Sequence, residues 1–97
     1  MSASLPDLEP VWVVEATYAP NAAQRRPQFR AEHLMRLVAL KAEGTVIEAG
    51  AYADLSGSLV LVRAESADAA LGLFRSDVYI TNGIWTELRA RGFGRVV

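Results

Sequence analysis

A chain of 97 residues is long enough to bury one hydrophobic core but not two, so we expect a single domain. Its ten Lys and Arg and eleven Asp and Glu residues nearly balance and are scattered, which argues against nucleic-acid binding. The absence of cysteine excludes disulfides and thiolate sites, and no apolar run reaches the roughly 18–20 residues of a membrane span. The first ten residues do not resemble a secretory signal, so we expect a cytoplasmic protein that does not bind membranes.

The N-terminal half of the chain predicts an arm, a strand and a long helix. Residues 1–10 contain two prolines and few large apolar side chains, so we expect a flexible arm. Residues 11–18 are β-branched and aromatic in composition, which predicts a strand. A helix is predicted from about residue 28 to 43, because Pro27 suits a first helical turn and Gly44 suits a helix end.

The C-terminal half predicts three more strands and a second helix. Strands are expected at residues 45–53, 58–65 and 84–93. Ser66 is a good N-cap for a short helix that ends near residue 74, and residues 75–83 are expected to be irregular or to form one helical turn.

The resulting order, β-α-β-β-α-β, is the ferredoxin-like α+β plan, an antiparallel sheet with both helices on one face. The helix-free face should carry one of two apolar rows in the first and third strands. Both rows are apolar in mid-strand, whereas a strand solvated on one side should alternate. We therefore expect a homodimer that packs sheet against sheet through the helix-free face. The rows are Val11, Val13, Leu59 and Leu61 on one side and Trp12, Val14, Ala16, Tyr18, Val60, Val62 and Ala64 on the other.

His33, the only histidine, lies on the predicted long helix beside an apolar stripe. It could pack there, or it could move protons if a carboxylate fixed its tautomer. Asp54 suits a turn and Asp68 the first turn of a helix, whereas Asp77 could either end a helix or pair with the histidine. Helical spacing gives the stripe as Leu34, Leu37, Val38 and Lys41.

Two segments resemble the YciI-like (YCII-related) family. They are R-A-E-H-L-M-R-L-V-A-L-K-A-E-G-T-V-I-E-A-G at residues 30–50 and S-D-V-Y-I-T-N-G-I-W at residues 76–85. The family pattern has an R-x-x-H-L helix start, a Gly after that helix, a strand ending in Gly, and a D-P-Y/F segment followed by Gly. The likeness spans roughly residues 11–93, so residues 11–97 are expected to form one YciI-like domain. The chain departs from the pattern at Val78 and Ala51, where the family has or often has Pro.

The resemblance implies a dimeric α+β barrel with a catalytic pair, His33 and Asp77. Arg30 would hold an anionic group of a small-molecule ligand, and Tyr79 would form a wall of the site or hydrogen bond to the ligand. Relatives that resemble dehydrochlorinases and muconolactone isomerases suggest a lyase or isomerase acting on a small cyclic or aromatic compound. Two other interpretations stay open. One is a non-catalytic small-molecule-binding or accessory dimer, and the other is oxygenation without a cofactor.

No cofactor or metal site is expected. One histidine without cysteine is a poor basis for a transition-metal site, and neither a calcium-loop motif nor an H-E-x-x-H motif occurs. The aromatic residues could line a pocket or simply fill the core and the dimer interface. These are Trp12, Tyr18, Tyr52 and Trp85.

Overall fold

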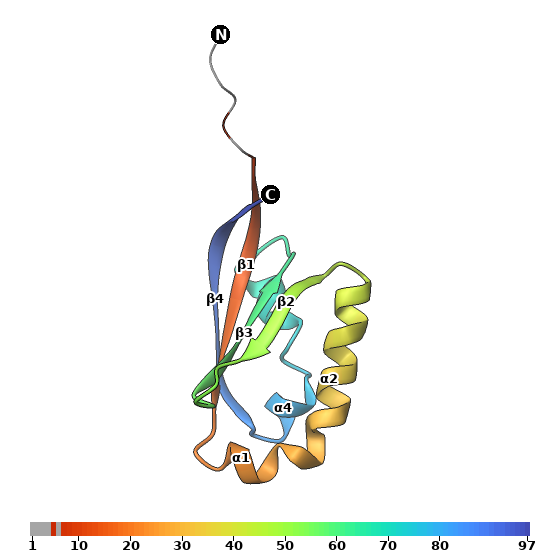
Figure 1. Ribbon diagram of the computed structural model, residues 1–97, viewed down its shortest axis with the longest axis vertical. Coiled ribbons are helices and arrows are strands. Elements are labelled where there is room, and N and C mark those ends of the chain that lie inside the picture. The colour runs from red at the N-terminus through yellow and green to blue at the C-terminus, as the bar shows by residue number, and fades with distance from the viewer. Residues whose placement is uncertain (1–4, 6) are drawn as a thin grey trace.

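A four-stranded antiparallel sheet with helices on one face makes up the protein (Figure 1). The computed structural model describes residue 5 and residues 7–97. The strands lie in the order β2-β3-β1-β4, and every neighbouring pair is antiparallel. This is the predicted ferredoxin-like α+β fold. No helix of the described residues is long and apolar enough to cross a membrane. The elements are β1 (Leu8–Tyr18), α1 (Ala22–Arg25), α2 (Pro27–Ala42), β2 (Val46–Ala51), β3 (Gly57–Val62), α3 (Ala67–Gly72), α4 (Val78–Thr81) and β4 (Trp85–Val96).

The first strand begins at Leu8, earlier than the residue 11 that the sequence suggested. The cause is β4, which continues to Val96 and pairs with β1 as far as Leu8. Glu9 then gains ion pairs with Arg63 at 2.6 Å and Arg95 at 3.0 Å. The last three residues of the predicted arm therefore belong to β1. Its residues 1–4 and 6 lie outside the described part of the chain.

The inner face of α2 agrees only in part with the stripe that helical spacing suggested, Leu37 being the residue of that stripe that packs against the core. His33 is the buried residue of this helix, at 4% exposure, and Phe29 and Leu37 pack partly buried against the core. Val38, at 67% exposure, and Lys41 are exposed, so their assignment to the inner face is wrong, whereas Leu34 is 42% exposed and lines a cleft beside the sheet. Apolar residues occur on both sides of α2, and spacing alone cannot tell which side meets the sheet.

The core lies between the sheet and the helices. Val14 and Val60 are buried in it, together with aromatic residues such as Phe74. The other face of the sheet carries a smaller apolar centre, because residues paired across strands share a face. Val13 pairs with Leu61 and Val11 with Phe93 on that side.

The segment from α3 to β4 carries two side-chain caps. Ser66 accepts a hydrogen bond from the Ala69 backbone at 3.0 Å, as expected for the N-cap of α3. Asp77 caps α4 in the same way, accepting from the Tyr79 backbone at 2.9 Å. Residues 78–81 thus form a single helical turn, and its cap fixes the position of the Asp77 carboxylate.

Candidate active site

A cleft of about 200 Å³ opens between α2 and the β2–β3 side of the sheet. Its walls combine aliphatic and aromatic side chains with a small number of polar groups, the usual make-up of a ligand pocket. The polar side chains that line it are Tyr18, Arg26, Arg30, His33, Ser58 and Tyr79.

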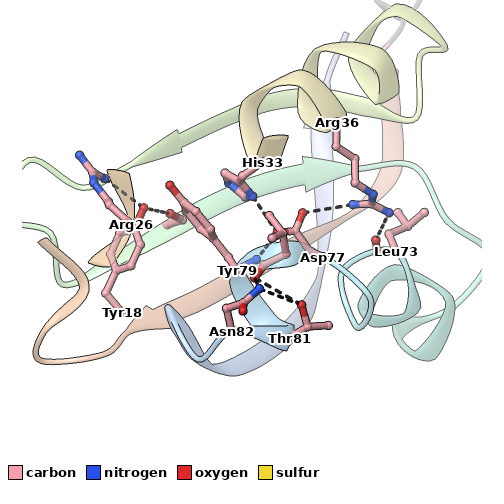
Figure 2. A network of polar contacts seen from close by, with 11 residues as sticks. Tyr18, Arg26, His33, Arg36, Leu73, Asp77, Tyr79, Thr81 and Asn82 are labelled. Atoms are coloured by element: carbon pink, nitrogen blue, oxygen red, sulfur yellow. Dashed lines mark hydrogen bonds and ion pairs between the residues drawn. The ribbon is translucent and has the colours of Figure 1, made fainter. Parts of the chain in front are cut away.

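His33 and Asp77 meet inside this structure although 44 positions separate them in the chain. The Nδ1 of His33 lies 2.8 Å from the Oδ1 of Asp77 (Figure 2). The His33 side chain comes from the inner face of α2, and that of Asp77 from the cap of α4, which packs against α2. The predicted hydrogen bond between the two residues is confirmed.

Asp77 is fully buried and is held as a carboxylate by three donors. His33 Nδ1 and the Tyr79 backbone N–H both bond to Oδ1, and Arg36 Nη1 lies 3.4 Å from Oδ2. Burial alone would raise the pKa of Asp77. The hydrogen bonds from His33 and Tyr79, with the nearby charges of His33 and Arg36, outweigh that effect and lower the pKa of Asp77. The acid is therefore ionised at neutral pH.

This carboxylate determines which nitrogen of the imidazole is available. Asp77 can only accept, so the neutral His33 ring carries its proton on Nδ1 and keeps a lone pair on Nε2. The Nε2 of His33 makes no hydrogen bond to the described residues. It is nevertheless accessible, because the one side-chain nitrogen or oxygen of those residues that is both buried and without a partner is Trp85 Nε1. Nε2 therefore faces the cleft that His33 lines.

Aromatic rings hold the imidazole in place. Tyr79 stacks on His33 with ring centres 3.8 Å apart and planes 8° apart, and Trp85 meets the same ring edge-on at 4.8 Å. His33 was expected at the border of an apolar stripe, but this packing makes it part of the interior. An imidazole clamped in this way has a fixed direction for Nε2, which a proton-transfer group needs.

The two other predicted site residues lie on the same cleft. Tyr79 is 1% exposed, and burial raises the pKa of its phenol, with a further contribution from nearby Tyr18. Arg30 is exposed on α2 and lines the cleft, and it makes no hydrogen bond or ion pair within the described residues. The structure thus brings all four predicted residues to one place, with Arg30 at the solvent side.

Sequence reasoning missed Arg36, although its position three residues after His33 puts both on one helix face. Arg36 bonds to Asp77 and to the backbone carbonyl of Leu73, joining α2 to the end of α3.

A second group that the sequence did not predict as a cluster contains Tyr18, Arg26 and Ser58. Their hydroxyls and guanidinium meet at the other end of the cleft, and no sequence spacing relates these three positions. Of the four aromatic residues proposed as pocket walls, Tyr18 and Trp85 line the cleft whereas Trp12 and Tyr52 do not.

No metal centre can be assembled from the side chains that the structure describes. Among residues 5 and 7–97, no three His, Asp or Glu side chains come close enough together to hold a metal ion.

Comparison with known proteins places the chain among small proteins of similar length. An uncharacterized protein of Haemophilus influenzae is 28% identical over 95 residues, which cover 88% of this chain and 97% of that protein. Protein YciI of Escherichia coli is 27% identical over 96 residues, covering 89% of this chain and 98% of the relative.

A solved structure shares the fold. It is the 5-chloro-2-hydroxyhydroquinone dehydrochlorinase of Burkholderia phenoliruptrix in complex with 2,5-dihydroxybenzoquinone. The TM-score is 0.71 and the identity 22%, over 84% of this chain and 90% of that one. The model of the YCII-related domain matches residues 11–93, which is most of the chain. The protein therefore belongs to the YCII-related domain family.

Proposed function

We propose that this protein is a cofactor-free enzyme of the lyase or isomerase type that acts on a small cyclic or aromatic compound. One observation carries the proposal: a buried carboxylate, Asp77, hydrogen bonds to His33 Nδ1 at 2.8 Å while Nε2 faces a cleft. His33 is the general base in this account, and Asp77 sets its tautomer and stabilises the imidazolium.

The chemistry needs only acid and base groups. Nε2 of His33 takes a proton from a carbon next to a carbonyl group. The electron pair of that C–H bond forms a C=C bond, and the carbonyl π pair moves onto oxygen to give an enolate. Return of the proton to another carbon completes an isomerisation, and departure of a leaving group with its electron pair completes an elimination. No oxidant or reductant is consumed in either case.

The size and lining of the cleft support a single-ring substrate. An apolar cavity of about 150 Å³ can hold benzene, and this cleft of about 200 Å³ leaves room for ring substituents. Tyr79 and Trp85 offer aromatic walls, and Arg30 offers a positive charge at the solvent side. The dehydrochlorinase with the same fold was solved with a dihydroxybenzoquinone, a ring compound of this kind.

The proposal includes a cytoplasmic homodimer that packs through the helix-free face of the sheet. Support comes from the apolar centre of that face, where Leu59 and Leu61 are half-buried and Phe93 is 48% exposed. A second copy of the same face is the simplest cover for such a surface.

Turnover of a panel of ring compounds tests the enzymatic proposal. Chlorinated hydroxyhydroquinones report through chloride release, and unsaturated lactones report through a shift in ultraviolet absorbance. The wild type should convert at least one compound, and His33→Gln should slow the conversion at least about a hundredfold, the usual worth of a positioned acid–base group. His33→Gln suits the test better than His33→Ala, because truncation would leave a void beside Tyr79 and Trp85.

Two results would overturn the proposal. Equal rates for the wild type and His33→Gln would remove the histidine from the chemistry. Binding of panel compounds in the cleft without any conversion would favour the alternative function, a non-catalytic small-molecule-binding or accessory protein.

A further inference from the structure

A second cluster of polar side chains lies at the end of the cleft away from Asp77. The hydroxyl oxygen of Tyr18 accepts a hydrogen bond from Ser58 Oγ at 3.2 Å and another from Arg26 Nη1 at 3.3 Å. Tyr18 and Ser58 are 8% and 4% exposed, so the contact between their hydroxyls is buried at the wall of the cleft. Figure 2 shows Tyr18 and Arg26 on one side of His33 and Asp77 on the other.

Arg26 can only donate, so the Tyr18 hydroxyl oxygen accepts a hydrogen bond from it. The Ser58 hydroxyl donates to the same oxygen in the assigned arrangement, and Ser58 Oγ is then the sole other hydrogen-bond partner of Tyr18 among the described residues, which leaves the Tyr18 proton for another acceptor. Tyr18 lines the cleft, so the remaining O–H can be donated to a bound molecule. A hydroxyl that already accepts two bonds, one of them from a cation, donates a stronger one.

The charge at this end of the cleft is positive. The Arg26 guanidinium lies 5.7 Å from the centre of the Tyr18 ring, and Arg30 follows one helical turn later on the same wall. Neither arginine forms an ion pair with a carboxylate in the part of the chain that the structure describes. Two uncompensated cations beside a free O–H donor favour a ligand atom that carries negative charge.

The Tyr18 cluster lies close to His33, the proposed base. The Tyr18 and Tyr79 ring centres are 6.3 Å apart, and Tyr79 in turn stacks on His33 at 3.8 Å. Tyr18 and His33 therefore pack on the same Tyr79 ring and line the same cleft, so a ligand that fills the cleft lies against both.

We propose that Tyr18, supported by Arg26 and Ser58, forms an oxyanion subsite that selects single-ring compounds with an ionised ring oxygen, a phenolate or an enolate. This inference rests on the proposed function, in which removal of a carbon-bound proton by His33 leaves an enolate. The Tyr18 hydroxyl donates a hydrogen bond to that oxygen, and the two arginines balance its charge.

Binding of a probe that is not turned over tests the subsite. The probe is 4-nitrophenol, held at a pH at which it is ionised, and 4-nitroanisole is its methyl ether, which cannot ionise. Dissociation constants are measured by absorbance or calorimetry for the wild type, Tyr18→Phe and Arg26→Gln. Tyr52→Phe is the matched control, because Tyr52 does not line this cleft.

The wild type and Tyr52→Phe should prefer the phenolate to the ether. Tyr18→Phe should weaken phenolate binding roughly tenfold to a hundredfold, the worth of a hydrogen bond to a charged group, and leave ether binding unchanged. Arg26→Gln should shift the preference in the same direction and serves if Tyr18→Phe does not fold.

Equal loss of both probes in Tyr18→Phe, or an unchanged preference for the phenolate, would overturn the subsite. His33→Gln separates the two proposals. It should keep the phenolate preference, so a protein without turnover can still confirm the subsite, and an active enzyme can still refute it.

Discussion

The chemistry of single residues depends on one buried carboxylate. Asp77 has no access to water, yet His33, Arg36 and the Tyr79 backbone all donate to it or offset its charge. Partners of this kind are what make a buried charge tolerable. The hydrogen bond from His33 also orients the imidazole. The same contact therefore stabilises the ionised form of Asp77 and leaves the Nε2 lone pair of His33 free to accept a proton.

The acid sensitivity of the protein should change when Asp77 is neutralised. The pKa of Asp77 is lowered by folding, so its ionised form stabilises the fold above the pKa of the unfolded chain. That stabilisation is lost as pH falls through the folded pKa, below about pH 4. Asp77→Asn should cost about 1–3 kcal/mol of unfolding free energy at neutral pH and flatten the decline in acid.

Urea titrations from neutral pH to about pH 3 measure this effect. Asp68→Asn is the control, because that carboxylate is exposed at the surface of α3. If the unfolding free energy fell as steeply in acid for Asp77→Asn as for the wild type, the buried carboxylate would not contribute to the acid sensitivity.

For the helices and strands, the sequence predicted the type of each element better than it predicted which side of the element is buried. Strand composition, Pro27, Gly44 and the Ser66 cap were enough to find most elements. The buried face of α2 was predicted only in part, because a polar residue, His33, occupies its centre while apolar Val38 is exposed. Polar residues at a site break the periodicity from which faces are read.

The β1–β3 pairing predicts that Gly57 cannot be replaced. A Cβ on Gly57 would collide with the backbone carbonyl oxygen of Ala16, and backbone atoms in a sheet cannot move aside. Gly57→Ala should destabilise the fold by about 2 kcal/mol or more, as overpacking does. Gly50→Ala is the matched control, since a Cβ there meets nothing within 4 Å. Equal urea midpoints for the two variants would refute the predicted clash.

For the whole molecule, the order of elements predicted the fold, and the resemblance to a family predicted that His33 and Asp77 lie together as a pair. The Tyr18 subsite could not be predicted, because its three side chains come from β1, the start of α2 and β3. Only the folded sheet brings these positions together, and no motif links them.

The helix-free face predicts a dimer. Val13 and Leu61 pair at its centre, so Leu61→Asp should place a charge in the interface and yield monomers or precipitate. Met35→Asp, at a position 72% exposed on α2, should leave the dimer intact. Sedimentation velocity at micromolar concentration distinguishes the species, and a stable wild-type monomer of 10.5 kDa would contradict the proposed assembly.

The tautomer of His33 decides whether Nε2 can accept a proton, and it can be measured cleanly because a chain with one histidine gives only one set of imidazole signals. The measurement is a long-range ¹H–¹⁵N spectrum of protein with labelled histidine, taken at a pH at which the ring is neutral. We predict a protonated Nδ1 and an unprotonated Nε2, and loss of this preference in Asp77→Ala. A wild-type ring with its proton on Nε2 would leave no lone pair facing the cleft and would contradict the proposed role of His33 as a base.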